Sequence, residues 1–372
     1  MIKKILFTAS IPLHFKAFHL PYLAWFKSQG YEVHVACNGY VELPHVDKLW
    51  DVPFVRSPFS LGHIKAYRIL NKIIEREEYV LINCHTPMAS VLTRLASMKA
   101  RKHGTKLLYT AHGFHFFKGA SMLHWALFYP VEILLSKYTD AIICINPEDF
   151  DLISTKGNKS CAYYLIPGIG VSNSRFFEVS IAEKTAIRVT NNFATTDFLL
   201  VYAAEYIGRK NHDFIIQAIK DNIDKVEGIK ILFAGKGVLE DKLMNAVKQY
   251  HLEEYIYFLG FRSDIDQIYK MSDVGISSSK QEGLGINLVE EMMCGLPVIA
   301  TVDRGHSEVV DHEVNGFLIA QNDHNQFVAY LLQLKNDKQM RAEFSRQAKI
   351  KADKFELRNS LKVMAGIYER YL

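Results

Sequence analysis

The most informative stretch of the chain is SSSKQEGLGINLVEEMMCGLPVIAT, residues 277–301. It is entered by the apolar run VGISSS and closed by PVIAT, which is the pattern of two buried parallel strands joined by a helix. A glycine-rich turn precedes the helix, which we expect to begin near Ile286. Glu282 stands in the turn, and Glu290 lies inside the otherwise apolar helical run. Carboxylates in such surroundings indicate a ligand.

The start of this helix is suited to an anion. Its first backbone N–H groups have no partner within the helix, and the helix dipole places positive potential there. We therefore expect Gly285 and the N–H groups of Asn287 and Leu288 to contact a diphosphate. Glu290, about one turn further along, would accept hydrogen bonds from a pair of sugar hydroxyls. Glu282 would point toward the group beyond the phosphates.

The rest of the chain repeats the strand and helix pattern of this stretch. The runs KILFTAS, EVHVACN, VLINCH, KLLYTAHG and AIICIN predict buried strands in the first half, and FLLVYAAE, KILFAG and IYFLG predict more in the second. This succession predicts an α/β fold of two Rossmann-like, doubly wound domains facing a central cleft. We expect domains at residues 1–170 and 171–354, with a C-terminal helix over about 355–372 that packs back on the first domain.

Composition limits the function classes. The chain has 372 residues, of which 49% are hydrophobic and 23% charged, and these values are typical of a soluble two-domain protein. The net charge of +4 is too small for a nucleic-acid binder. Its five cysteines form no CxxC pair, which favours free thiols in the reducing cytoplasm. The apolar window 122–138 is interrupted by charged residues and proline, so we expect no membrane span.

Other strand-end loops carry residues that could bind a phosphate-containing ligand. Arg209 and Lys210 follow FLLVYAAE and could contact a pyrophosphate. Gly235 follows KILFAG in a sharp turn that would let a ligand approach the backbone. Arg262 lies in a third loop, after IYFLG. The alternative for each of these loops, considered alone, is that its side chains are exposed to solvent and bind no ligand.

Histidines gather in the first half of the chain. His112 directly follows the strand KLLYTAHG, His115 comes three residues later, and His85 ends VLINCH. His14 and His19 precede or begin a helix, so a role in a ligand site and a role in capping or packing are both open. No acidic residue or cysteine lies close in sequence to His112 and His115, so we expect no metal ion.

The pair Asp264 and Asp266 superficially matches a DxD metal-binding motif. The two residues follow Ser263 at an expected helix start, where capping and the helix dipole favour acidic residues. We therefore predict a structural role for them.

EGLGINLVEEMMCGLPVIAT resembles the signature of family 4 retaining glycosyltransferases of the GT-B fold, in which two glutamates are separated by seven residues. HTPMASVLTRLA, YTAHGFHFFKGA, IPGIGVS and RKNHDFIIQA resemble the bacterial exopolysaccharide and capsule branch of that family. The resemblance covers essentially the whole chain. It implies that the C-terminal domain binds a nucleotide-sugar and the N-terminal domain an acceptor.

The resemblance also implies individual roles. Glu290 would bind the ribose hydroxyls, Glu282 the donor sugar and Lys210 the diphosphate, while His112 would lie near the transferred sugar. The residues expected on the acceptor side are His14, His19, His85 and His115. The loop of Arg262 would flank the base. Many family members have Gly-Arg where this chain has Ala204-Glu205, so the usual phosphate-binding arginine is missing. Whether Arg209 replaces it stays open at this stage.

The function implied is transfer of a sugar, with retention, from a nucleotide-sugar, expected to be a UDP-sugar. The implied acceptor is a saccharide linked to polyprenyl diphosphate, and neither a metal nor a cofactor is expected. The alternatives are a sugar-nucleotide 2-epimerase of the same fold and a non-catalytic nucleotide-sugar-binding protein. The basic segment 90–106 has an apolar stripe that suits the cytoplasmic membrane face, although a solvated helix is the alternative.

Overall fold

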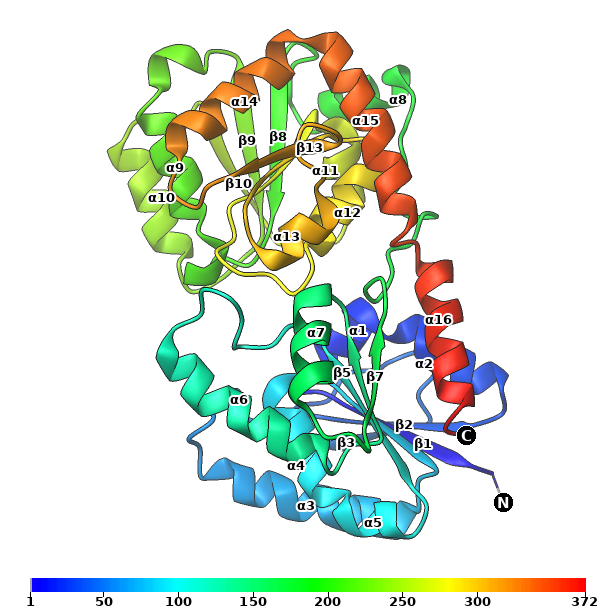
Figure 1. The fold of residues 1–372 in the computed structure, drawn as a ribbon. Coiled ribbons are helices and arrows are strands. Elements are labelled where there is room, and N and C mark those ends of the chain that lie inside the picture. Colours follow the sequence, from blue (N-terminus) through cyan, green and yellow to red (C-terminus); the bar gives the residue numbers. More distant parts are fainter. Residues whose placement is uncertain (1) are drawn as a thin grey trace. The chain divides into compact units, whose positions relative to one another are not determined.

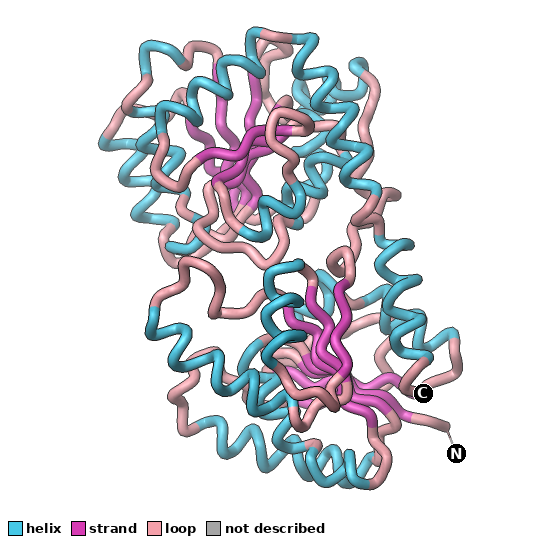
Figure 2. The backbone as a smooth tube through the Cα atoms, viewed as in Figure 1, coloured by secondary structure: helices cyan, strands magenta, loops and turns pink. Residues whose placement is uncertain are grey.

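The computed structural model describes residues 2–372, and the chain divides into two compact units. Unit 1 consists of the residues up to Gly170 together with Arg358–Leu372, and unit 2 of Val171–Leu357. Each unit has one parallel sheet flanked by helices (Figure 1), and the strands of each sheet form a layer between helices (Figure 2). The two doubly wound α/β domains predicted from the sequence are therefore present.

The sheet of unit 1 has the strand order β3-β2-β1-β4-β5-β6-β7. The five strands predicted for this half are confirmed, whereas the sequence analysis missed β3 and β7. Both missed strands lie at the edges of the sheet and are only partly buried. β3, KLWD, has no continuous apolar run, whereas β7, AYYL, is apolar. The strands are β1 (Lys4–Thr8), β2 (Glu32–Cys37), β3 (Lys48–Asp51), β4 (Leu81–Cys84), β5 (Lys106–Ala111), β6 (Ala141–Cys144) and β7 (Ala162–Leu165).

Helices cover both faces of this sheet because its strands carry apolar residues on both sides. Leu6 faces a core that includes residues of α3 and α4. Phe7, next along β1, contacts Phe26 of α2 and Tyr368 of α16 on the opposite face, with ring centroids 5.7 and 6.3 Å apart. The helices of unit 1 are α1 (Pro12–Phe18), α2 (Leu20–Ser28), α3 (Gly62–Glu77), α4 (Pro87–Ala96), α5 (Met98–Lys102), α6 (Met122–Ser136), α7 (Pro147–Lys156) and the C-terminal α16 (Leu357–Glu369).

The C-terminal helix α16 is joined to the centre of the first sheet. Asn83 of β4 donates from Nδ2 to the hydroxyl of Tyr368 at 2.7 Å, and both side chains are buried. The last residues of the chain therefore complete the core of unit 1.

The sheet of unit 2 has the order β10-β9-β8-β11-β12-β13. The five predicted strands are present, and the short edge strand β13 was missed. The strands are β8 (Phe198–Ala203), β9 (Ile229–Ala234), β10 (Ile256–Gly260), β11 (Val274–Ser277), β12 (Val298–Thr301) and β13 (Gly316–Ile319). The helices are α8 (Ile181–Thr190), α9 (His212–Lys220), α10 (Glu240–Gln249), α11 (Ile265–Met271), α12 (Ile286–Met293), α13 (Arg304–Val309), α14 (His324–Asn336) and α15 (Lys338–Asp353), with 3-10 turns at Gly208–Lys210 and Ile223–Lys225.

The basic segment 90–106 differs from both descriptions expected for it. Arg94 is fully buried, and its guanidinium binds the carboxylate of Glu132 on α6 at 2.7 and 3.0 Å. Arg101 binds Asp140 at 2.7 Å. The apolar stripe therefore packs partly into the core, and Arg94 can neither contact a membrane nor be solvated.

Two further expectations concern the whole chain. Over residues 2–372, none of the helices combines the length and the apolar character needed to cross a bilayer. The five cysteines are free and buried, as their spacing predicted.

Candidate functional site

Two loops of unit 2 bring three of the predicted side chains together. The loop after β8 carries Arg209 and Lys210, and the loop after β11 carries Glu282. Because β8 and β11 are neighbouring parallel strands, their carboxyl ends meet at one edge of the sheet. Arg209 Nη1 donates to Glu282 Oε2 at 3.0 Å, and Lys210 Nζ donates to Glu282 Oε1. The residues predicted to bind the diphosphate and the one predicted to bind the sugar thus form a single ion-pair cluster.

Hydrogen bonds to the backbone fix the two basic residues. Arg209 and Lys210 belong to the 3-10 turn Gly208–Lys210. The hydroxyl of Tyr202 donates to the carbonyl of Lys210 at 2.7 Å, and the N–H of Lys280 donates to the carbonyl of Arg209 at 2.9 Å. The turn is therefore held against the β11 loop independently of the ion pairs.

Glu282 is charged at neutral pH although it is 7% exposed. Burial alone would raise the pKa of Glu282, but the charges of Lys210 and Arg209 outweigh burial and lower it to about 2. The side chain of Lys210 is 15% exposed and that of Arg209 is 42% exposed. Arg209 is therefore the more accessible of the two cations. Glu205, which occupies the position of the missing arginine, is also exposed.

Asp303 and His306, which the sequence did not single out, lie beside Glu282. The N–H of Glu282 donates to Asp303, which also accepts a hydrogen bond of 2.7 Å from the N–H of the buried His306 as the N-cap of α13. His306 Nδ1 donates to the carbonyl of Thr301 at 2.6 Å. Within the described chain, Nε2 has no hydrogen-bond partner. In the sequence, Asp303 three residues before His306 could indicate the start of a helix. It could not indicate that Asp303 binds the N–H of Glu282.

The helix α12 begins at Ile286, as predicted, with Gly285 as its N-cap. No side chain caps its first turn in the described structure. A Cβ atom on Gly285 would lie 3.1 Å from His306 Cδ2, so a larger residue would press on this histidine. Leu288 is buried, and Asn287 Nδ2 lies 3.4 Å from Glu291 Oε1. Of the predicted residues in this turn, Leu288 can therefore offer a ligand only its backbone.

Glu290 has a different environment from Glu282. It accepts a hydrogen bond of 3.1 Å from the hydroxyl of Tyr269, and no cation within the described residues forms an ion pair with it. Burial raises the pKa of Glu290 to about 7, although part of the side chain reaches solvent. The next residue, Glu291, is fully buried, and burial raises its pKa well above the usual value. Glu290 is the accessible carboxylate of α12, as its predicted role requires.

The remaining predicted donor residues have identifiable structural partners. A Cβ atom on Gly235 would lie 2.0 Å from the carbonyl oxygen of Ala204, so this glycine allows the β8 and β9 loops to pack closely. Arg262 binds both carboxylate oxygens of Asp264 at 2.7 Å. Asp264 occupies the N-cap position of α11 but makes no capping hydrogen bond, and Asp266 binds Lys270 at 3.0 Å. The predicted helix start is correct, whereas capping by Asp264 is wrong because Arg262 takes its carboxylate.

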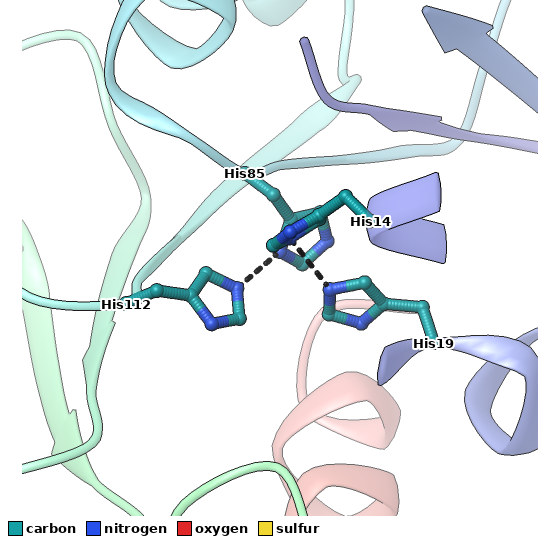
Figure 3. A group of neighbouring side chains, drawn as sticks. All are labelled: His14, His19, His85 and His112. Carbon is teal, nitrogen blue, oxygen red and sulfur yellow. Dashed lines mark hydrogen bonds between the residues drawn. The ribbon is translucent and has the colours of Figure 1, made fainter. Parts of the chain in front are cut away.

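Four of the predicted histidines meet in unit 1 at the carboxyl ends of β1, β4 and β5. Figure 3 shows His14, His19, His85 and His112 with their rings turned toward one another. His19 Nε2 and His14 Nε2 are 3.1 Å apart, and His85 Nδ1 and His112 Nε2 are 3.3 Å apart. His19 makes no capping hydrogen bond as the N-cap of α2. His115 is exposed and packs against Phe128, 4.9 Å between centroids, so the structure separates it from His112.

Two family models match the chain. Residues 183–351 match "Glycosyl transferases group 1", and residues 23–167 match "Glycosyltransferase Family 4". The chain is 43% identical over its whole length to "Putative glycosyltransferase EpsD" of Bacillus subtilis (strain 168), of which it covers 98%. It is also 27% identical to "UDP-Gal:alpha-D-GlcNAc-diphosphoundecaprenol alpha-1,3-galactosyltransferase" of Escherichia coli, with 74% of this chain and 71% of that protein covered.

Solved structures share the fold over nearly the whole chain. Anabaena HepE in complex with UDP and glucose superposes with a TM-score of 0.81 at 21% identity, covering 99% of this chain and 100% of that one. WaaG, a glycosyltransferase involved in lipopolysaccharide biosynthesis, gives a TM-score of 0.77 at 16% identity, covering 98% and 99%. The two parallel-sheet units therefore have the GT-B fold.

Proposed function

Because the chain belongs to the glycosyltransferases with group 1 and family 4 domains, we propose that it transfers a sugar from a UDP-sugar to a lipid-linked saccharide, with retention. The observation that carries this proposal is the grouping of Arg209, Lys210 and Glu282 at the sheet edge where α12 begins. Two cations and a helix N-terminus suit a diphosphate. The UDP, UDP-glucose and glucose in the HepE structures support the choice of donor.

We assign each part of the nucleotide to residues of unit 2. The carboxylate of Glu290 accepts hydrogen bonds from the ribose hydroxyls, and the loop of Arg262 flanks the base. The diphosphate lies against Arg209, Lys210 and the N–H groups of Asn287 and Leu288. Arg209 then stands in for the arginine that is usual at position 205, because its guanidinium is the more accessible cation of the cluster.

The ion pairs suggest how binding prepares the reaction. A diphosphate competes with Glu282 for Arg209 and Lys210, and this competition releases the carboxylate toward the donor sugar. When the anomeric bond breaks, negative charge grows on the departing diphosphate, and the two cations with the start of α12 stabilise it. We assign no covalent nucleophile. The acceptor hydroxyl attacks from the face that the diphosphate leaves, and a phosphate oxygen accepts its proton, so this step draws on no metal ion.

The acceptor is assigned to unit 1. The name of the Escherichia coli relative describes a diphosphoundecaprenol substrate, and the Bacillus subtilis relative matches over the whole chain, which supports a polyprenyl-diphosphate-linked saccharide and exopolysaccharide or capsule synthesis. We place the enzyme in the cytoplasm, at the inner membrane face. The exposed Leu95 and the exposed lysines Lys99 and Lys102 of α4 and α5 offer a peripheral contact.

A panel of UDP-sugars tests the function. The purified protein should release UDP slowly from one donor and faster when a polyprenyl-diphosphate-linked saccharide is added. Conversion of the donor to its 2-epimer without an acceptor would indicate an epimerase. Binding of UDP-sugar with no release of UDP under either condition would indicate a non-catalytic binding protein.

A further inference from the structure

We propose that His14, His19, His85 and His112 of unit 1 bind one divalent transition-metal ion of the zinc class. Each side chain can direct one ring nitrogen to a common point, and these four atoms all lie within 4.8 Å of one another. In a tetrahedral site with Zn–N bonds of about 2.0 Å, the nitrogen atoms are separated by about 3.3 Å. Two of the pairs, at 3.1 and 3.3 Å, already have that separation.

The four residues come from separate parts of the unit. His14 lies on α1, His19 at the junction of α1 and α2, and His85 and His112 in the loops that follow β4 and β5. Their spacing in the sequence, with gaps of 5, 66 and 27 positions, resembles no zinc motif, and the sequence-based expectation of no metal considered only His112 with His115. The topology assembles the set because β1, β4 and β5 are neighbours in the sheet.

Two of the ligands form a rigid half of the site. His19 is 2% exposed and His85 is 1% exposed, and their ring centroids are 4.0 Å apart. His85 also stacks on Phe7 at 5.5 Å, so its ring is held from behind. His14 and His112 are partly exposed, so an ion can reach the cluster from their side.

The donor set suits a transition metal. Each of the four side chains offers an imidazole nitrogen, and imidazole is a common metal ligand in proteins. Four imidazoles suit zinc, copper or nickel, whereas magnesium and calcium prefer oxygen ligands.

A packed cluster of histidines without a metal is the alternative. In that case, hydrogen bonds between His14 and His19 and between His85 and His112 would satisfy one nitrogen of each ring. The buried Nε2 of His85 has no partner within the described residues in either case, because Nδ1 is the nitrogen that faces His112. An ion that fixes the four rings would join the start of α2 to the loops after β4 and β5.

The test is direct metal binding by the full chain, without donor or acceptor. Protein stripped with a chelator is titrated with zinc against a chromophoric competitor, and separately with Co²⁺, whose visible absorption reports tetrahedral nitrogen coordination. We expect one ion per chain, and His14→Gln and His85→Gln should each weaken binding by about tenfold or more. His103→Gln and His251→Gln change exposed histidines outside the cluster and should leave the affinity unchanged.

His14→Gln is the informative variant because His14 is partly exposed, and circular dichroism checks that the variant is folded. Three results would each overturn the proposal: no stoichiometric binding by the wild type, equal binding by folded His14→Gln, or loss of binding in His103→Gln or His251→Gln. None of these results depends on whether the chain transfers a sugar, so the test is separate from that of the proposed function.

Discussion

Arg209 and Glu282 are 73 positions apart in the sequence, yet Arg209 Nη1 donates to Glu282 Oε2 at 3.0 Å. Lys210 holds the other oxygen of the same carboxylate. The cluster carries one more positive than negative charge, counted as two cations and one carboxylate. A dianionic diphosphate at this edge would thus meet partly paired cations rather than free ones.

Lys210→Ala should weaken UDP binding by about 1.5–3 kcal/mol, the range for a hydrogen bond to a charged group. Glu205→Ala is the matched control because Glu205 is exposed in the same loop and cannot offset phosphate charge. Calorimetric titration of UDP into both variants makes the comparison. Equal UDP affinities would show that the diphosphate does not bind at Lys210.

His112→Ala should lower the turnover number and leave UDP affinity nearly unchanged, because His112 belongs to unit 1 whereas the nucleotide is assigned to unit 2. His103→Ala, an exposed histidine of unit 1, is the control for turnover. A loss of UDP affinity in His112→Ala together with a lower melting temperature would indicate a structural role instead.

The affinity for UDP should rise with pH between about pH 6 and pH 8, because Glu290 has a pKa of about 7 and its ionised form accepts the ribose hydrogen bonds. The ionised fraction grows as the pH passes that pKa, so the sign is an increase. A UDP phosphate also titrates in this range, so the quantity to measure is the difference between the wild type and Glu290→Gln. Tyr269→Phe removes a hydrogen bond that lowers the pKa of Glu290, and should move the midpoint of the rise to higher pH. A pH profile equal in wild type and Glu290→Gln would contradict this assignment.

Glu132→Ala should reduce the free energy of unfolding by about 3–5 kcal/mol, because it leaves the fully buried Arg94 without its partner. The exposed pair of Lys99 and Glu75 is the control, and Lys99→Ala should change stability by less than about 1 kcal/mol. Urea denaturation of the three proteins measures both effects. Similar losses for the two variants would mean that the buried pair is not a stabilising element.

Much of the fold could be predicted from the sequence because the central strands are continuous apolar runs. β1, β4 and β5 show this pattern, whereas the edge strands β3, β7 and β13 were not predicted, and of these β3, KLWD, has no apolar run. The helix that begins at Leu20 ends near Gly30, whose φ of +81° explains the glycine.

The site could be predicted only in part. The loops of Arg209 and Glu282 follow neighbouring strands, so strand order predicts that they meet. The contact of Asp303 with the Glu282 N–H depends on the path of a loop, and the buried pairing of Arg94 with Glu132 depends on helix packing. The four histidines share no local motif, and only the three-dimensional arrangement brings them together.

The central claim is that unit 2 binds the nucleotide with Glu290 at the ribose and Glu282 at the transferred sugar. The most direct measurement is calorimetric titration of UDP into the wild type, Glu290→Gln and Glu282→Gln, with turnover measured in parallel. Glu290→Gln should weaken UDP binding by about 1.5–3 kcal/mol because a charge-assisted hydrogen bond is lost. Glu282→Gln should not weaken UDP binding, because it removes the carboxylate that competes for Arg209 and Lys210, and it should lower the turnover number. Loss of UDP affinity in Glu282→Gln, with full affinity in Glu290→Gln, would contradict the claim.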